Sequence, residues 1–195
     1  CTQILNMSLR AEIQERRVLL ETPIVTPKFV TAFLAEQVVK HVLRGFRPDA
    51  ELHLAIPGLE TCHIVVLVPA MKDDRASDYA DWPNYQLQPH CIYEHSEGGK
   101  ATWSHKFDDI ARCKALQLWH DRNDDRTDCM PHLLFPGDTP YWGGVKRHGI
   151  VVTCSGVDPW FDKMISGMIA DMIIGFAYRS LMSGEDKKED RSFLK

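Results

Sequence analysis

The segment from Phe107 to Val157 constrains the fold more than any other part of the chain. It opens with FDDIARCKALQLWH, passes through a polar loop and continues as PGDTPYWGGVKRHGIVVTCSGV. Asp108 and Asp109 place negative charge in the first turn of a helix, and the glycine pair at 143–144 marks a turn before an apolar strand. We therefore expect a helix with a central lysine, a glycine turn and a strand that closes on Ser-Gly.

The apolar stretch that follows predicts a long helix packed against a sheet. Asp158 can cap this helix, and Pro159 suits its first position. The stretch from Trp160 to Met182 contains four charged residues within about the 20 residues that a membrane span needs, so we expect no membrane span. The expected core stripe consists of Phe161, Ile165, Met168, Ile169, Met172, Ile173 and Phe176.

Apolar spacing upstream predicts the remaining elements. A helix should begin at Thr26-Pro27 and end near Gly45. Strands are expected at residues 50–56 and 63–71, and two hairpins at 90–106 (strands 90–96 and 101–106) and 145–157, the second turning near His148-Gly149. Helix, two strands, hairpin, helix, hairpin and helix in this order indicate an α+β fold, with helices on an antiparallel sheet.

The length of 195 residues favours one domain with extensions. We expect a single domain over residues 1–182, interrupted by an ordered insertion loop at about 72–89, whose sequence is too long for a tight turn. Residues 183–195 read SGEDKKEDRSFLK, which predicts a mobile charged tail.

Charge and cysteine usage limit the partners and the compartment. A net charge of −4 offers no bulk attraction to nucleic acid or to an anionic membrane, so neither partner is expected. The six cysteines form no C-x-x-C pair, which favours reduced thiols and a cytoplasmic protein. An organellar location reached through a removed targeting segment is compatible with the same sequence.

Several motifs resemble the haem-degrading or GlcG/HbpS-like domain family. IARCKALQLW is similar to the family helix with an A-x-x-K-A signature, PGDTPYWGG to its Gly-Gly turn and GIVVTCSGV to its closing strand. Upstream, EIQERRVLLETPIVTPKFVTAFLAEQVV resembles the start of the UPF0303-like branch. That branch usually has a histidine just before Gly-Gly, where this chain has Trp142.

The resemblance implies a profilin-like α-β-α sandwich that assembles into homodimers or larger homo-oligomers. Members of the family bind haem or its precursors, so we expect a haem or tetrapyrrole-binding protein without established catalysis. The binding slot should lie between the helix of Lys114 and the hairpin from Gly143 to Ser155.

Haem needs an apolar slot, an axial ligand and cations near its propionates. The candidate axial ligands are His105, His120 and His148, and the other candidate ligand-binding residues are Lys114, Gly143, Gly144, Lys146, Arg147 and Ser155. Each histidine taken alone is more often a surface or hydrogen-bonded side chain. Lys114 has an alternative interpretation as a snorkelling lysine, and a turn that needs positive φ explains the glycines equally well.

No catalytic residue is assigned. Cys-Ser-Gly-Val around Ser155 lacks the second glycine of a G-x-S-x-G elbow, and no zinc spacing, P-loop or dinucleotide motif occurs. One alternative function is an oligomeric interaction module that contacts a protein partner through Tyr79, Trp82 and Tyr85. A weaker alternative is an enzyme acting on a small organic acid, which a pocket lined by ionisable groups would favour.

Overall fold

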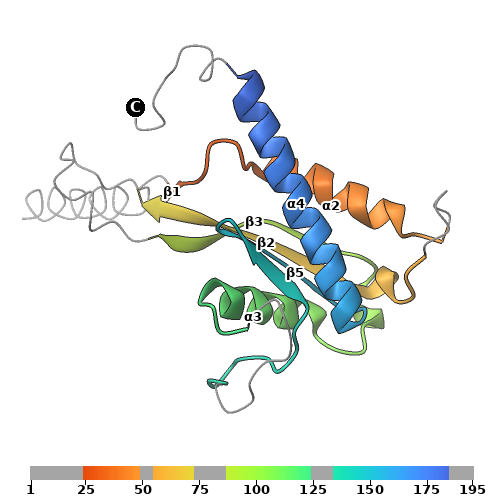
Figure 1. Cartoon of the computed structure of the whole chain (residues 1–195). Helices are drawn as coiled ribbons and strands as arrows, with labels where there is room; N and C mark the ends of the chain where they lie inside the picture. Colours follow the sequence, from red (N-terminus) through yellow and green to blue (C-terminus); the bar gives the residue numbers. More distant parts are fainter. Residues whose placement is uncertain (1–23, 49–54, 73–86, 124–133, 185–195) are drawn as a thin grey trace, which may run out of the picture. The chain divides into compact units, whose positions relative to one another are not determined.

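The computed structural model describes residues 24–48, 55–72, 87–123 and 134–184 (Figure 1). The chain divides into two compact units, one made of Cys1–Thr26 and Ala70–Gln88, the other of Pro27–Pro69 and Pro89–Lys195. In the first unit, strand β1 (Ile24–Val25) pairs antiparallel with the end of β2, where Ile24 lies opposite Lys72. The second unit contains the helices and the cavities described below.

The sheet of the second unit is built around β2 (His63–Lys72) and β5 (Ile150–Ser155). These two strands run antiparallel, with His63 opposite Ser155. Strand β4 (Gly144–Arg147) pairs antiparallel with the other edge of β5, and β3 (Gln88–Ser96) is a further partner of β2. The predicted strand at 63–71 and the hairpin turning near His148-Gly149 are therefore confirmed.

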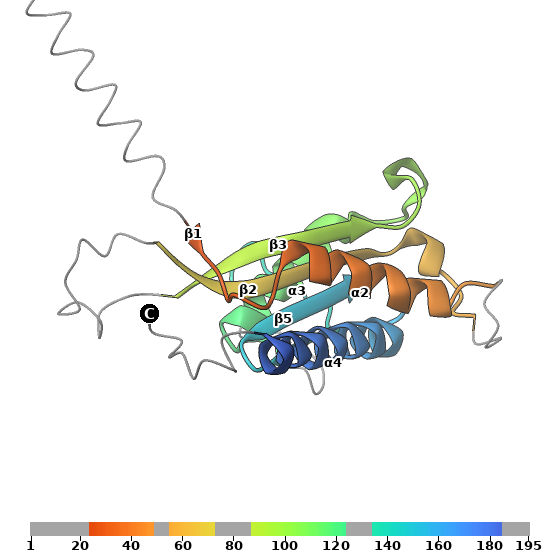
Figure 2. The ribbon, with the colours of Figure 1, turned by 90° about the horizontal axis from the view of Figure 1, so that it is seen from above.

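Helices cover both faces of this sheet. Alternate residues of β2 point to opposite sides: Ile64, Val66 and Val68 join the core under α2 (Ala32–Gly45) and α4 (Pro159–Ser183). Val65 and Leu67 pack instead with α3 (Phe107–Trp119). Figure 2 shows α2 and α4 lying side by side along one face. The α+β class with helices on an antiparallel sheet is confirmed.

Helix α2 starts later than predicted. Thr31 is its N-cap, and the Thr31 Oγ1 accepts a hydrogen bond from the Leu34 N–H at 3.1 Å. The residues after Pro27 form a turn instead, closed by the Val30 N–H donating to the Pro27 carbonyl at 3.2 Å. The prediction of a start at Thr26-Pro27 was wrong because a better cap, which supplies a side-chain acceptor to the helix, lies five residues further on.

The predicted strand at 101–106 does not form. Lys100–Thr102 is a 3-10 turn, in which the Thr102 and Trp103 N–H groups donate to the carbonyls of Gly99 and Lys100. These donors are therefore not available for a sheet ladder, and β3 pairs with β2. Ala55 and Ile56, at the end of the predicted strand 50–56, are not in a strand either, and residues 50–54 lie outside the described residues.

Helix α4 has the predicted cap, but only three of the seven residues of the predicted core stripe are buried. The Asp158 Oδ1 accepts a hydrogen bond from the Trp160 N–H at 3.0 Å. Ile165, Ile169 and Ile173 are buried, whereas Phe161, Met168 and Phe176 remain 40%, 40% and 43% exposed. Apolar residues occur on nearly every side of this helix, so spacing alone does not identify its buried side.

By length and composition, α4 is the one helix in the described part of the chain that could cross a membrane. Core helices of sheet proteins share these properties, and α4 packs on β4 and β5 through its isoleucines. It also buries the polar side chains of Asp162 and Ser166 against the sheet.

Candidate ligand-binding site

A cavity of about 330 Å³ lies where the slot was expected, between the start of α3, the end of β5 and the start of α4. We call it the slot. Its wall includes Phe107, Lys114 and Ser155, together with Asp158 and Asp162, which sequence reasoning did not place there. Ser155 is a buried residue of this wall.

Lys114 is buried and fully engaged within the chain. Its side chain is about as enclosed as any in the core, at 1% exposure for the residue, so it does not snorkel to the surface. The Lys114 Nζ donates to the Cys154 carbonyl and to the Asp162 Oδ2, both at 3.0 Å. Burial raises the pKa of Asp162, against the opposing effect of the Lys114 ammonium. The Asp162 carboxylate thus balances the charge of Lys114, one of the three cations that were expected to attract an anionic ligand.

Close packing explains the glycine pair. A Cβ on Gly143, whose φ is +121°, would lie 2.6 Å from the Asp162 Cβ, and one on Gly144 would lie 2.5 Å from the Thr153 Cγ2. Neither glycine lines the slot. Their role in the fold is to let the chain pass tightly between α3 and α4.

Lys146 and Arg147 belong to neighbouring ion pairs and do not line the slot. The Lys146 Nζ donates to the Trp119 carbonyl and to Asp121, both at 2.8 Å, at the C-terminal end of α3. Arg147 forms an ion pair with Asp171 of α4. Both cations therefore tie β4 to the adjacent helices.

Of the three candidate axial ligands, the structure brings only His105 to the slot. Its ring stacks on Phe107, with centroids 5.9 Å apart. His120 follows the end of α3, and His148 occupies the β4–β5 turn with φ +48°. Within the described ranges, no group of three or more His, Cys, Asp or Glu residues could hold a metal ion.

The slot is a poor fit for a tetrapyrrole. Its volume lies at the lower end of the range for ligand pockets, about 300–1,000 Å³. Two carboxylates line it, and its only lysine is already neutralised by one of them. The same charges oppose the binding of a small organic acid, although the wall is rich in ionisable groups.

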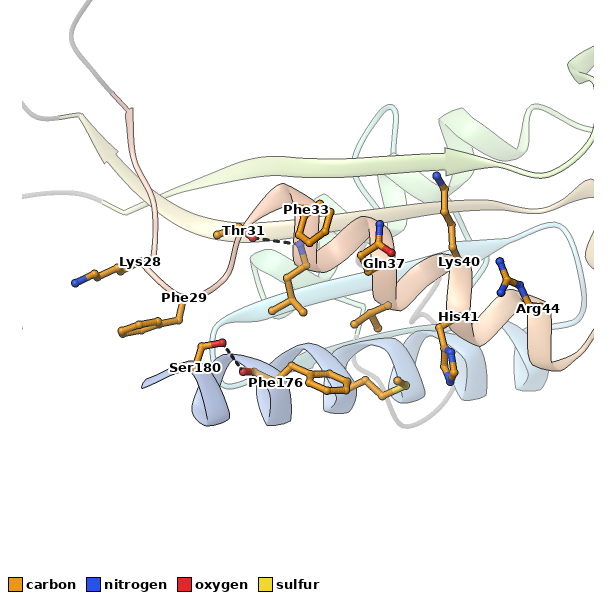
Figure 3. Close-up of a pocket in the computed structure, with 13 residues that line it drawn as sticks. Lys28, Phe29, Thr31, Phe33, Gln37, Lys40, His41, Arg44, Phe176 and Ser180 are labelled. Carbon is orange, nitrogen blue, oxygen red and sulfur yellow. Dashed lines mark hydrogen bonds between the residues drawn. The ribbon is translucent and has the colours of Figure 1, made fainter. Parts of the chain in front are cut away.

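A larger cavity of about 650 Å³ lies between α2 and α4 (Figure 3). We call it the groove. Its apolar lining comes from α2, from the turn before it and from α4, and consists of Phe29, Phe33, Leu34, Val38, Met172 and Phe176. Figure 3 shows Phe33 on α2 and Phe176 on α4 contributing to this lining from the two helices.

The polar lining of the groove is cationic. It includes Lys28, Lys40 and Arg44, together with His41, and no Asp or Glu side chain lines it. Lys40 Nζ pairs with Glu36 at 2.6 Å on the outer side of α2, and this hydrogen bond raises the pKa of Lys40. The groove thus combines apolar walls, one imidazole and several positive charges.

Sequence reasoning missed the groove because it used α2 only for its buried stripe. A signal was present: Gln37, Lys40, His41 and Arg44 follow the spacing i, i+3, i+4 and i+7, which places them on one side of a helix. The residues of α4 that line the groove follow Arg44 by 128 residues or more, so no local spacing indicates that they belong to it.

Comparisons of the chain with family models, with curated proteins and with solved structures give no match. The function must therefore be inferred from the two cavities and from the resemblance of the quoted motifs.

Proposed function

We propose that this protein binds haem or a related tetrapyrrole in the groove between α2 and α4, on a profilin-like fold of the GlcG/HbpS class. The observation that carries the proposal is the lining of the groove. It offers apolar surface, a histidine and cations without a carboxylate, in about 650 Å³.

The groove matches the chemistry of the ligand. A tetrapyrrole is a flat apolar ring with anionic propionates, so it requires apolar contact along its faces and cations at one edge. Phe33 and Phe176 provide aromatic surface, and Arg44 makes no ion pair with the described residues and is thus available to a carboxylate.

His41 and Met172 are the residues of the groove that suit an iron ion. Imidazole nitrogen and thioether sulfur are both axial ligands of haem in proteins, and both side chains line the cavity. When bound, haem would supply an iron centre for electron transfer or for binding a diatomic gas.

Tyr79, Trp82 and Tyr85, the contact surface of the interaction-module hypothesis, lie outside the described residues. An enzyme acting on a small organic acid gains no support from the slot, because its wall carries more negative than positive side chains. The cytoplasmic location remains a prediction.

The test is a haem titration of the purified chain at micromolar concentrations, followed by its absorbance spectrum. We expect a saturable shift of the Soret band, which His41→Ala moves or abolishes. Arg44→Glu should weaken binding by about tenfold, which corresponds to about 1.4 kcal/mol, because it reverses a charge at the edge of the groove.

Two control variants separate the possible sites. His148→Ala removes an exposed histidine from a turn and should leave the titration unchanged. His105→Ala removes the histidine of the slot. A Soret shift that depends on His105 and not on His41 would place the ligand in the slot, and the absence of any shift in the wild type would contradict haem binding altogether.

A further inference from the structure

The outer side of α4 carries an apolar stripe that the described part of the chain does not cover. Phe161, Met164, Met168 and Met182 are 40%, 39%, 40% and 44% exposed, at spacings that place them along one side of the helix. Phe161, Met164 and Met168 lie within about two turns of one another, and a cluster of exposed apolar residues marks an interaction site more often than does a single exposed residue.

Gly175 lies in the middle of this stripe. A glycine inside a helix costs about 0.8–1.0 kcal/mol relative to alanine, so its presence calls for a local reason. Gly167 has one, because a Cβ there would lie 3.2 Å from the Arg147 Nη2. At Gly175 nothing in the described part of the chain lies within 4 Å of such a Cβ, so no close contact among those residues requires the glycine. Glycine also lets the backbone of a second helix approach closely.

The side chains around Gly175 are arranged in complementary pairs. Asp171 precedes Gly175 by four residues and Arg179 follows it by four, while Met168 and Met182 lie seven residues before and after it. In an antiparallel pair of identical helices that cross at Gly175, residues equally far from the crossing point come level with each other. Asp171 is then level with Arg179 of the other copy, twice, and Met168 with Met182.

We infer that α4 is the interface of a homodimer, in which two copies of the helix cross antiparallel at Gly175. The occupant of the stripe is a second copy because the charges are self-complementary only in this arrangement. A parallel pair would place Asp171 beside Asp171 and Arg179 beside Arg179, which repel each other.

The ion pairs of the single chain are compatible with this interface. Asp171 contacts Arg147 through its Oδ2 only, and its side chain stays 61% exposed. Arg179 is exposed and has no ion-pair partner among the described residues. Arg179 is therefore the cation best placed to find its partner in a second copy.

The first test is the molar mass in solution as a function of concentration, measured by analytical ultracentrifugation. We expect a dimer at micromolar concentrations. Arg179→Asp should raise the dissociation constant at least tenfold by placing two carboxylates level across the interface. Asp171→Arg should do the same, and the combined variant Asp171→Arg/Arg179→Asp should restore the dimer, because it recreates both pairs with the signs exchanged.

A second variant tests the close approach of the helices. Gly175→Leu should produce a monomer by holding the two backbones apart. Its thermal unfolding should not occur at a lower temperature than that of the wild-type monomer, because the site is open and leucine favours helix. A variant that lost the dimer only by failing to fold would be identified by its circular dichroism.

Three outcomes would overturn the inference. The first is a wild type that stays monomeric throughout the micromolar range. The second is a dimer that tolerates both Arg179→Asp and Gly175→Leu. The third is a monomer that binds vesicles of phosphatidylcholine and phosphatidylglycerol through the stripe. The last result would assign the stripe to a lipid surface. None of these measurements uses haem, so they test the interface independently of the proposed function.

Discussion

At the scale of single residues, the buried pair of Lys114 and Asp162 dominates the slot. The two side chains are 2% and 5% exposed, and the other oxygen of Asp162 accepts a hydrogen bond from the Val157 N–H at 3.3 Å. Charges at this depth are stable only while they remain paired and hydrogen-bonded. The lysine is thus primarily a structural link between α3 and α4.

We predict that Lys114→Met lowers the free energy of unfolding by about 3–5 kcal/mol, because it leaves the Asp162 carboxylate buried without a counter-charge. Lys114→Met/Asp162→Asn should recover part of this loss, since asparagine keeps an acceptor for the Val157 N–H and removes the charge. Denaturant unfolding measures both variants.

Lys146→Met is the matched control for that prediction. It removes a lysine of the same sheet region whose ion pair with Asp121 is largely exposed, and it should cost at most about 1 kcal/mol. If Lys114→Met and Lys146→Met lowered the free energy of unfolding equally, burial would not make the Lys114–Asp162 pair more important for stability than an exposed pair.

At the scale of secondary-structure elements, the glycine pair positions β4 between two helices. The Gly144 backbone packs against Leu118 of α3, while Gly143 packs against Asp162 of α4. The Gly143 carbonyl also accepts a hydrogen bond from the Ser166 Oγ at 3.2 Å. Side chains at these two positions would separate the layers that enclose the slot.

Gly144→Ala should therefore destabilise the fold by about 1–3 kcal/mol, the usual cost of overpacking a core. The added Cβ would meet the Thr153 Cγ2 at 2.5 Å and the Leu118 Cδ1 at 2.6 Å. Gly45→Ala provides the comparison, because nothing lies within 4 Å of a Cβ there. Thermal unfolding measures both variants. An unfolding temperature lowered as much by Gly45→Ala as by Gly144→Ala would contradict the role of close packing at Gly144.

Sequence predicted those elements whose signals are local. The α3 helix, the β4–β5 hairpin and the Asp158 cap depend on contiguous residues, and all three form. The strand at 101–106 was wrong because its partner could not be known: β3 pairs with β2, and Lys100–Thr102 forms a 3-10 turn instead of a second hairpin strand. Similarly, spacing could not show which side of α4 faces the sheet.

The candidate site depends more on long-range contacts, so less of it could be predicted. The slot was expected around Lys114 and Ser155, and a cavity is present there. Its electrostatic character, however, is determined by Asp162, 48 residues after Lys114, and no sequence spacing connects the two. The groove combines α2 with α4 and was not expected at all.

At the scale of the whole molecule, a buried histidine of β2 lies beside the ion pair that joins β3 to α3. His63 is 2% exposed, and its Nδ1 shares a hydrogen bond of 2.8 Å with the Ser96 Oγ. Its Nε2 makes no hydrogen bond with the described residues and lies 3.7 Å from the Glu94 Oε2, a carboxylate that Arg112 already holds.

Burial lowers the pKa of His63 from its ordinary value of 6.5, and Arg112 acts in the same direction. The charge of Glu94 opposes this shift without reversing it. In acid, the unfolded chain therefore takes up a proton at His63 before the folded chain does. Protonation then favours the unfolded state, so the free energy of unfolding should fall as the pH drops through about 6.5.

We predict that this loss is smaller in His63→Gln, which retains a polar side chain beside Ser96 and has no proton to take up. Chemical unfolding between about pH 8 and about pH 5.5 measures it, a range that lies above the ordinary pKa of carboxylates. Glu94 does not interfere there, because Arg112 lowers its pKa further and its contribution is lost only in stronger acid. His148→Gln, at an exposed turn, should follow the wild type, and a wild-type slope in His63→Gln would mean that His63 carries none of the pH dependence.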